Sequence, residues 1–266
     1  MTEKYSFSRL ETFHNCKRAF YNDYVIKQRG GDNVYSYCGT VTHELAQGII
    51  QDTETNDGAV SKFIEAIDEM ELMGLEWMSD KVRDNYVEAV THFLVNYNPD
   101  QNDTYRIEDY FEIEIGGYVL RGYIDLWYRV GRKIYIVDYK TSTKFSAKDL
   151  PKKSRQLILY GIHLSEKYPD HEIILQFNMM KYVLKKGKLY ERVKLDIFDE
   201  DYPDGILEVN YTDEAVMEVK EYVTNTIKQI KQMSDDKNEW TMDKDPKRDF
   251  FCKNLCGHRL KCLSEI

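Results

Sequence analysis

Two aspartates and a lysine lie close together in a segment rich in β-forming residues. Asp125 stands in GYIDLW, and Asp138 and Lys140 stand in IYIVDYK. Because side chains alternate between the faces of a strand, Asp138 and Lys140 project from the same face while Tyr139 points away. Carboxylate oxygens can hold Mg²⁺ or Mn²⁺, the metal activates water, and a lysine orients the nucleophile or stabilises developing charge. The pattern therefore predicts phosphodiester hydrolysis.

The D/E-x-K triplet by itself has little specificity, because it occurs four times, at Asp138, Glu218, Asp235 and Asp245. Only the triplet at Asp138 ends a strongly apolar β run that has a second acid on a neighbouring strand. The other three lie in a predicted helix or in a polar tail. The alternative to a catalytic pair is a salt bridge between Asp138 and Lys140 at the end of a strand.

Two helical motifs flank this segment. GTVTHELAQ places His43 in the first turns of a helix after a glycine, where a histidine is more often a capping or core residue than a ligand. RQLILYGIHL places Gln156 and Tyr160 four residues apart on one helix face, after the basic loop that follows Lys140. Each motif alone is ordinary. The order of all four motifs is what makes the sequence unusual.

The elements that must position these residues follow from apolar periodicity. Ser8 and Glu11 form a capping box that predicts a helix beginning near Arg9. Strands with glycine turns cover 111–143, and two more lie near 172–183 and 188–196. Further helical stretches begin at about 41 and cover 59–73, 79–97, 152–167 and 212–232. This order predicts a mixed α/β fold.

The succession of the four motifs resembles the RecB-like branch of the PD-(D/E)XK nuclease superfamily, from about residue 5 to the C terminus. The resemblance implies a restriction-endonuclease-like α/β core with a mixed central sheet flanked by helices. It also implies a single nuclease domain over 1–266, with a helical insertion at about 52–104. The position of this insertion, between His43 and the strands, favours a cap over the cleft.

In that family the histidine and both aspartates bind the catalytic metal, and the residue between the acid and the lysine lends its carbonyl. The resemblance therefore implies that Mg²⁺ or Mn²⁺ is bound by His43, Asp125, Asp138 and the carbonyl of Tyr139. It implies a catalytic role for Lys140. Gln156 and Tyr160 match the family's glutamine and tyrosine, which help to position the DNA and the active site. Ile124 precedes Asp125 where other superfamily members have proline, as is common in this branch.

Three of the five cysteines crowd the segment FFCKNLCGHRLKC, residues 250–262. In a reducing compartment, clustered cysteines indicate metal ligands rather than disulfides. Some nucleases of this branch, such as CRISPR-associated iron-sulfur exonucleases and AddB-type nuclease domains, hold a [4Fe-4S] cluster with one early and three late cysteines. The resemblance gives an iron-sulfur region over about 1–30 and 233–266. It assigns the cluster to Cys16, Cys252, Cys256 and Cys262. The late spacing is C-x3-C-x5-C, where the usual one is C-x2-C-x5-C.

A structural zinc site is the alternative to the cluster, with the same four thiolates or with His258 in place of one. The first ligand is solitary and far from the others in sequence, which favours iron-sulfur. Either metal would fasten together chain ends that are remote in sequence. Cys38 is left over, and we expect it to be a small packing residue beside the helix of His43.

The charge pattern gives no global basic field, because 46 acidic and 37 basic side chains leave a net charge of −9. Bound divalent cations can nevertheless receive a phosphate. Two segments, 144–156 and 181–194, are locally positive, and some of the 21 tyrosines could stack on unpaired bases. The sequence has neither a signal peptide nor a membrane-spanning run. We expect a soluble cytoplasmic protein of a bacterium or a phage-infected cell, without membrane contacts.

The resulting hypothesis is a Mg²⁺- or Mn²⁺-dependent DNA exonuclease that acts on single-stranded or frayed ends and leaves 5′-phosphates. Recombination, repair or phage DNA processing, with possible protein partners, would be its context. The alternative is a non-catalytic DNA-binding or assembly subunit of a recombination, packaging or CRISPR complex that retains the fold. A complete His-Asp-Asp-Lys set argues against a decayed site. No residue excludes RNA as the substrate.

Overall fold

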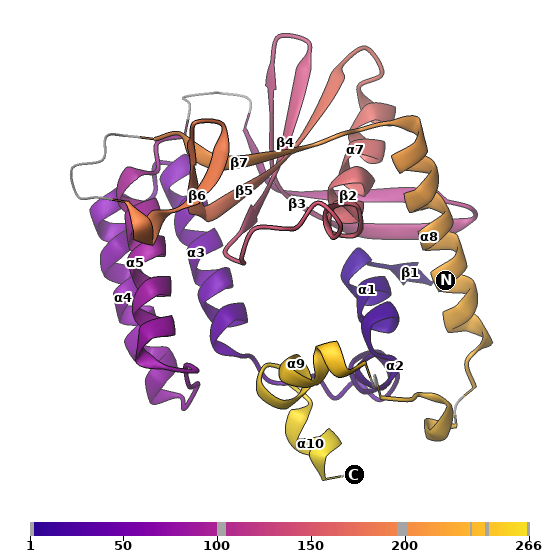
Figure 1. The fold of residues 1–266 in the computed structure, drawn as a ribbon. Helices are drawn as coiled ribbons and strands as arrows, with labels where there is room; N and C mark the ends of the chain where they lie inside the picture. The colour runs from indigo at the N-terminus through magenta and orange to yellow at the C-terminus, as the bar shows by residue number, and fades with distance from the viewer. Residues whose placement is uncertain (1–2, 100–104, 196–201, 235, 243–244, 265–266) are drawn as a thin grey trace. The chain divides into compact units, whose positions relative to one another are not determined.

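The computed structural model describes residues 3–99, 105–195, 202–234, 236–242 and 245–264 (Figure 1). The chain forms two compact units. The sheet unit contains residues 34–109 and 124–212, and the terminal unit contains residues 1–33, 110–123 and 213–266. Strands β2 (Arg106–Ile115) and β3 (Tyr118–Val130) run from one unit into the other. The prediction of a single nuclease domain over 1–266 stays a prediction.

The strand that carries Asp138 and Lys140 is β4 (Lys133–Lys140), at the centre of the sheet unit. It pairs antiparallel with β3, where Leu126 lies opposite Val137. On its other edge it pairs parallel with β5 (Glu172–Lys185) along its whole length, so that Lys140 lies beside Met179. The sheet is therefore mixed, as predicted. The glycine turn at Gly131 has a φ of +59°, a backbone conformation that glycine adopts without strain.

Two shorter strands extend this sheet. Strand β6 (Lys188–Glu191) forms an antiparallel hairpin with the end of β5. Strand β7 (Asp204–Val209) pairs antiparallel with β5 as well. The sequence patterns predicted β6 but not β7, because the segment before the last long helix looked merely polar. Residue 196, the last of the predicted strand 188–196, lies outside the described residues.

Helices cover both faces of the sheet within the sheet unit. Helix α7 (Arg155–Lys167) packs on β4 and β5. The three-helix layer of α3 (Val34–Ile50), α4 (Asn56–Leu72) and α5 (Asp80–Asn96) shares a core with the opposite face. Val137 and Tyr139 belong to that core. Since side chains alternate along β4, Asp138 projects toward the face covered by α7.

The helical layer confirms the predicted helices but shifts their limits. Helix α3 begins at Val34 instead of about residue 41, because Val34 and Cys38 extend its buried stripe by two turns. Thr55 and Ser79 cap the following two helices by accepting hydrogen bonds from the backbone N–H groups of Gly58 and Val82. Residues 100–104 of the predicted insertion lie outside the described part of the chain.

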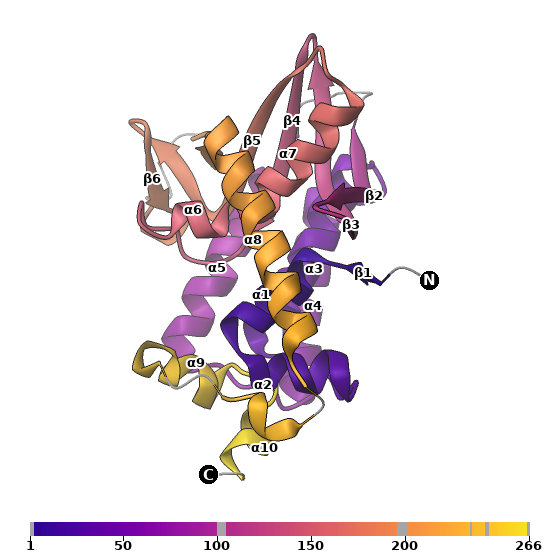
Figure 2. The same ribbon diagram turned by 90° about the vertical axis from the view of Figure 1, so that its right-hand side faces the viewer.

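The terminal unit holds both ends of the chain. Strand β1 (Lys4–Tyr5) pairs parallel with the start of β3. Helix α1 (Phe7–Asn15) packs beside α8 (Asp213–Gln232), as Figure 2 also shows. Helix α2 (Lys17–Phe20) follows α1 directly. Helices α9 (Asp249–Asn254) and α10 (Arg259–Leu263) carry the late cysteines.

The predicted capping box of α1 is wrong in its position. The residue that caps the helix is Ser6, whose Oγ accepts a hydrogen bond from the backbone N–H of Arg9 at 3.2 Å. Ser6 is extended and precedes the first turn, whereas Ser8 already lies inside the helix. The predicted buried face is correct, since Leu10 and Phe13 are both buried. Among the described helices, none is long and apolar enough to cross a membrane.

Candidate active site and cysteine pocket

The end of β4 presents a buried carboxylate that is paired with a lysine. Asp138 is 2% exposed, and Nζ of Lys140 donates a hydrogen bond to its Oδ1 at 2.7 Å. The second carboxylate oxygen, Oδ2, also lies 2.7 Å from Nζ, but it is buried and accepts no hydrogen bond. A buried carboxylate oxygen without a donor is costly. It is the kind of atom that a cation would satisfy.

Asp125 lies on β3 beside this pair. Because Leu126 is opposite Val137 across the two strands, the adjacent position on each strand brings Asp125 near Asp138. Burial, and then the negative charge of Asp138, raise the pKa of Asp125 to about 8. Two carboxylates this close repel each other unless one takes up a proton or a cation lies between them. The pair therefore has the electrostatics of a divalent cation site.

His43 reaches the same place from helix α3. Its Nδ1 is 3.9 Å from Oδ2 of Asp125. Its ring meets the ring of Tyr139 edge to face, with 5.8 Å between the centroids. Burial lowers the pKa of the imidazole, while the charge of Asp138 and the backbone of Tyr139 act in the opposite direction. A neutral imidazole is the form of histidine that binds metals.

Gln156 and Tyr160 come from helix α7 on the covered face. Nε2 of Gln156 donates a hydrogen bond to the Tyr160 hydroxyl at 2.6 Å. Burial raises the pKa of Tyr160, and the negative charges of Asp125 and Asp138 raise it further. The phenol therefore lies within the electrostatic reach of both carboxylates. The structure thus brings together all four motifs that the sequence analysis selected.

The donor set fits a hard divalent cation, since it offers carboxylate oxygens and one imidazole nitrogen. In the described part of the chain, however, no three His, Cys, Asp or Glu side chains are already arranged to hold a metal ion. The ammonium of Lys140 neutralises Asp138 instead. The residues therefore fit a metal chemically, and the chain without one balances its charges through lysine.

Glu108 is a candidate that the sequence did not indicate. Its negative charge contributes to the raised pKa values of Asp125 and Tyr160. Nε2 of Gln47, one helical turn beyond His43, donates a hydrogen bond to its Oε1 at 3.0 Å. Glu108 has a φ of +49°, which is unusual for a residue with a side chain and often marks a functional site. No motif could have found it, because it follows a polar, turn-like segment.

The other D/E-x-K triplets have no such surroundings. Glu218 is exposed on helix α8, and Asp245 is exposed in a short segment before α9. Asp235 lies outside the described residues. Context along β4, and not the triplet itself, is what selects Asp138.

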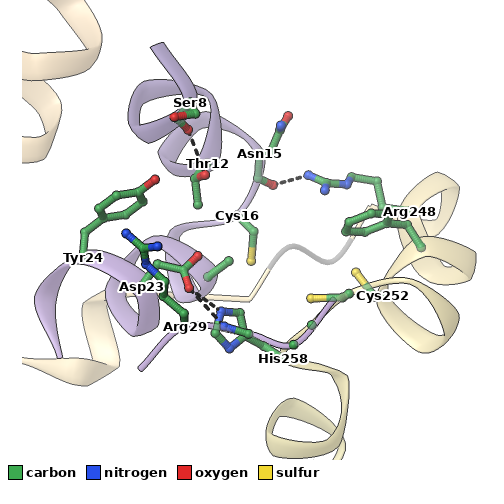
Figure 3. Close-up of a pocket in the computed structure, with 16 residues that line it drawn as sticks. Ser8, Thr12, Asn15, Cys16, Asp23, Tyr24, Arg29, Arg248, Cys252 and His258 are labelled. Atoms are coloured by element: carbon green, nitrogen blue, oxygen red, sulfur yellow. Dashed lines mark hydrogen bonds and ion pairs between the residues drawn. The ribbon is translucent and has the colours of Figure 1, made fainter. Parts of the chain in front are cut away.

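Three of the four cysteines predicted as cluster ligands line one pocket of the terminal unit. Cys16, Cys252 and Cys256 surround a cavity of about 520 Å³ together with Asp23 and His258 (Figure 3). Burial raises the pKa of the Cys256 thiol, and Cys16 adds to this effect. No disulfide joins any of the five cysteines, all of which are described. The fourth predicted ligand, Cys262 on α10, is not part of the pocket lining.

The walls of this pocket come from both ends of the chain. The guanidinium of Arg248 donates a hydrogen bond to the carbonyl of Asn15, next to Cys16. His258 Nε2 lies 2.9 Å from Oδ1 of Asp23. Asn33 donates a hydrogen bond to the carbonyl of Leu255 at 2.9 Å. Within the terminal unit, these contacts place the early cysteine beside two of the late ones, as the predicted clasp requires.

Cys38 is a packing residue, as predicted. It is completely buried in the helical layer, and its Sγ lies 3.7 Å from Sδ of Met70. Burial raises the pKa of this thiol to about 12. The thiol therefore stays protonated at neutral pH and is a poor nucleophile and metal ligand.

Comparison with known proteins gives one match. The model of the PD-(D/E)XK nuclease superfamily matches residues 4–262, which is nearly the whole chain and includes residues of both units. No curated protein matches the chain significantly.

Proposed function

Because the chain belongs to the PD-(D/E)XK nuclease superfamily, whose members are nucleases, we propose that it is a metal-dependent deoxyribonuclease. A nuclease acts on nucleic acid, and members of this superfamily typically use Mg²⁺ or Mn²⁺. The observation that carries the proposal is the environment of Asp138. This carboxylate is buried, paired with Lys140, and close to Asp125.

The proposed metal ligands are His43, Asp125, Asp138 and the backbone carbonyl of Tyr139. When bound, a divalent cation would lower the pKa of a water molecule and offset the charge of the phosphate. Lys140 would orient the attacking water and stabilise the charge that develops on the phosphate. It is well placed for this, because the metal would take over its present role as the cation beside Asp138.

Gln156 and Tyr160 would position the substrate rather than react. The hydrogen bond from Gln156 fixes the Tyr160 hydroxyl, whose own proton then points away from the amide. Burial and two neighbouring carboxylates keep this phenol protonated. A protonated hydroxyl can donate a hydrogen bond to a phosphate oxygen or to a carboxylate ligand. We therefore assign the pair to holding the DNA strand and the ligands in place.

We further propose that the chain is an exonuclease of the RecB-like branch that acts on single-stranded or frayed DNA ends and leaves 5′-phosphates. Recombination, repair or phage DNA processing is the proposed context. The order of the four motifs supports the branch. The cysteine pocket supports the same assignment, because in this branch an iron-sulfur cluster joins the two ends of the domain.

The proposed structural cofactor is a [4Fe-4S] cluster held by Cys16, Cys252, Cys256 and Cys262. Three of these thiols already face one pocket, and four thiolates complete such a cluster. Cys262 lies six residues beyond Cys256 and would supply the fourth. Zinc would use the same sulfur atoms. Iron and sulfide content and the visible absorption of protein purified without oxygen decide between the two metals.

Asp138→Ala and Lys140→Ala test the proposed site. Each should lower Mn²⁺-dependent DNA hydrolysis by at least about 10²-fold. The matched control is Lys133→Ala, because Lys133 lies at the opposite, exposed end of β4. It should keep full activity. Hydrolysis that survives both changes at the site would place the reaction elsewhere.

The mode of cleavage needs a separate substrate set. End-labelled linear single strands, linear duplexes and circular single strands of one sequence should be compared in Mg²⁺ and Mn²⁺. The proposal expects linear single strands to be digested from an end and circles to persist. Cleavage of circles would show an endonuclease, and loss of RNA at a similar rate would reject the preference for DNA.

A further inference from the structure

Strand β5 extends well beyond the strand that carries the candidate active site. Its parallel partner β4 ends with Lys140 beside Met179, and β5 continues from there to Lys185. At about 3.3 Å per residue, this extension spans up to about 20 Å. The hairpin that β5 forms with β6 (orange, at the left of Figure 1) therefore stands beyond the carboxyl end of β4, which is the end that holds Asp138.

The tip of this hairpin is built from lysines. We call residues 182–191 the lysine hairpin, because it contains Lys185, Lys186 and Lys188. Lys186 and Lys188 are exposed, and within the described part of the chain neither forms an ion pair with a carboxylate. The hairpin's single acid, Glu191, pairs with Lys194 at 2.8 Å. The tip thus carries a concentrated positive charge on a chain whose net charge is −9.

The arrangement of these lysines works against the stability of the hairpin. Lys185 and Lys188 lie directly opposite each other across the two strands, and like charges in that position destabilise a strand pair. Lys186 has a φ of +53°, in a turn position that asparagine, aspartate or glycine would occupy with less strain. An anion bound at the tip would remove the first of these penalties.

The base of the hairpin is nevertheless firmly held. Arg192 is almost completely buried, and its Nε donates a hydrogen bond to the carbonyl of Met180 at 2.8 Å. The same guanidinium pairs with Asp204 at 2.5 Å. Nζ of Lys185 packs over the rings of Tyr190 and Tyr202, at 5.2 and 4.8 Å from their centroids. The charge is therefore presented on a fixed support and not on a loose loop.

We propose that the lysine hairpin binds the phosphate backbone of the nucleic acid at a distance from the cleaved bond. This inference rests on the proposed nuclease function and adds the place where the substrate is held. A nucleic acid is the favoured partner because the hairpin and Asp138 lie at the same end of paired strands. Duplex phosphates repeat about every 3.4 Å per strand, so the contact lies about six nucleotides from the scissile phosphate.

Binding to long and short substrates tests the proposal. The variant Lys185→Gln, Lys186→Gln, Lys188→Gln removes three charges from the tip. The matched control Arg132→Gln, Lys133→Gln, Lys167→Gln removes three exposed charges at the other end of the same sheet. Both sets are combined with Asp138→Ala so that binding is measured without hydrolysis. The probe is a fluorescent oligonucleotide of about 20 nucleotides, single-stranded and duplex, in fluorescence anisotropy at several salt concentrations.

The hairpin variant should bind at least about tenfold more weakly, and the slope of log affinity against log salt should become shallower by about two. The control should change neither quantity. With the catalytic residues intact, the hairpin variant should cleave long strands less efficiently, while cleavage of a substrate of about three nucleotides stays unchanged, because it cannot span the distance. Equal losses in the hairpin and control variants would overturn the proposal, and so would weaker cleavage of the short substrate.

Two further arms keep the outcome clear. Lys186→Gln with Lys188→Gln changes only exposed side chains, so a folding defect caused by unstacking Lys185 from its tyrosines cannot explain its loss of binding. Wild-type binding to vesicles of anionic phospholipid that the hairpin variant loses, with oligonucleotide affinity unchanged, would assign the hairpin to a membrane and reject the proposal. Because anisotropy needs no hydrolysis, it tests the hairpin even if the wild type cleaves nothing, a result that would reject the nuclease function alone.

Discussion

The hydroxyl groups of Tyr97 and Tyr139 lie 2.5 Å apart in the core of the sheet unit. Tyr97 follows the last residue of helix α5, and Tyr139 separates Asp138 from Lys140 on β4. Both rings are buried. Their hydrogen bond joins the end of the helical layer to the strand that carries the candidate catalytic pair. It therefore gives that strand a fixed neighbour on the face opposite Asp138.

Tyr97→Phe should destabilise the chain by about 1–3 kcal/mol, because it leaves the Tyr139 hydroxyl buried without a partner. Tyr139→Phe should cost about as much for the same reason. The double variant should be more stable than the sum of the single effects implies, since no polar group is then stranded. Urea unfolding of all four proteins measures this. Strictly additive losses would show that the two hydroxyls do not interact.

Asp125→Asn should stabilise the chain in the absence of metal. The pKa of Asp125 is raised to about 8, so ionising it at neutral pH opposes folding. The wild type without metal should therefore lose stability as the pH rises from the ordinary aspartate range toward about 8, and the variant should lose less. Thermal unfolding in EDTA across this pH range measures the difference. Asp170→Asn, at an exposed position after α7, serves as the control.

Adding Mn²⁺ should reverse the order. A divalent cation stabilises the wild type by binding only the folded chain, and the variant lacks one of the proposed ligands. The midpoint of unfolding should rise with Mn²⁺ in the wild type and little in Asp125→Asn. An equal rise in both proteins would mean that Asp125 is not a ligand.

The local part of this fold could be predicted because it depends on short patterns. The turn at Gly116 and Gly117 sits between two alternating runs, and both glycines have the positive φ that such a turn requires. The alternation of side chains along β4 likewise predicted that Asp138 and Lys140 share a face, and their hydrogen bond confirms it. These features need only neighbouring residues.

The parts that escaped prediction depend on partners remote in sequence. Strand β7 is short, and only its pairing with β5 distinguishes it from a polar connection. The approach of Glu108 to Asp125 depends on a strained backbone that no pattern reports. The same is true of the bond between Tyr97 and Tyr139, which joins elements of different periodicity. Periodicity gives the face on which a side chain lies, but not what will lie opposite.

Ser6→Ala tests the corrected start of helix α1. Ser6 accepts a hydrogen bond from the backbone N–H of Arg9, and loss of such a cap costs about 1 kcal/mol. Ser8→Ala should cost less, because the Ser8 side chain caps no backbone N–H and lies within 3.0 Å of Ser6 Oγ. Chemical denaturation of the two variants ranks the serines. A larger loss for Ser8→Ala would restore the capping box that the sequence suggested.

Gly257→Ala tests whether close backbone approach forms the cysteine pocket. A Cβ at Gly257 would lie 2.8 Å from the backbone nitrogen of Gly31, so the segment that carries Cys256 would have to move away from residues 30–31. Gly31→Ala is the matched control, because a Cβ there meets nothing within 4 Å. We expect Gly257→Ala to lower the unfolding midpoint and, if the cluster proposal is right, the iron content per chain of anaerobically purified protein. Gly31→Ala should preserve both. Full iron content in Gly257→Ala would show that the cysteines do not need this approach, whereas a drop in stability with no iron in any of the three proteins would leave the close packing supported and reject the cluster.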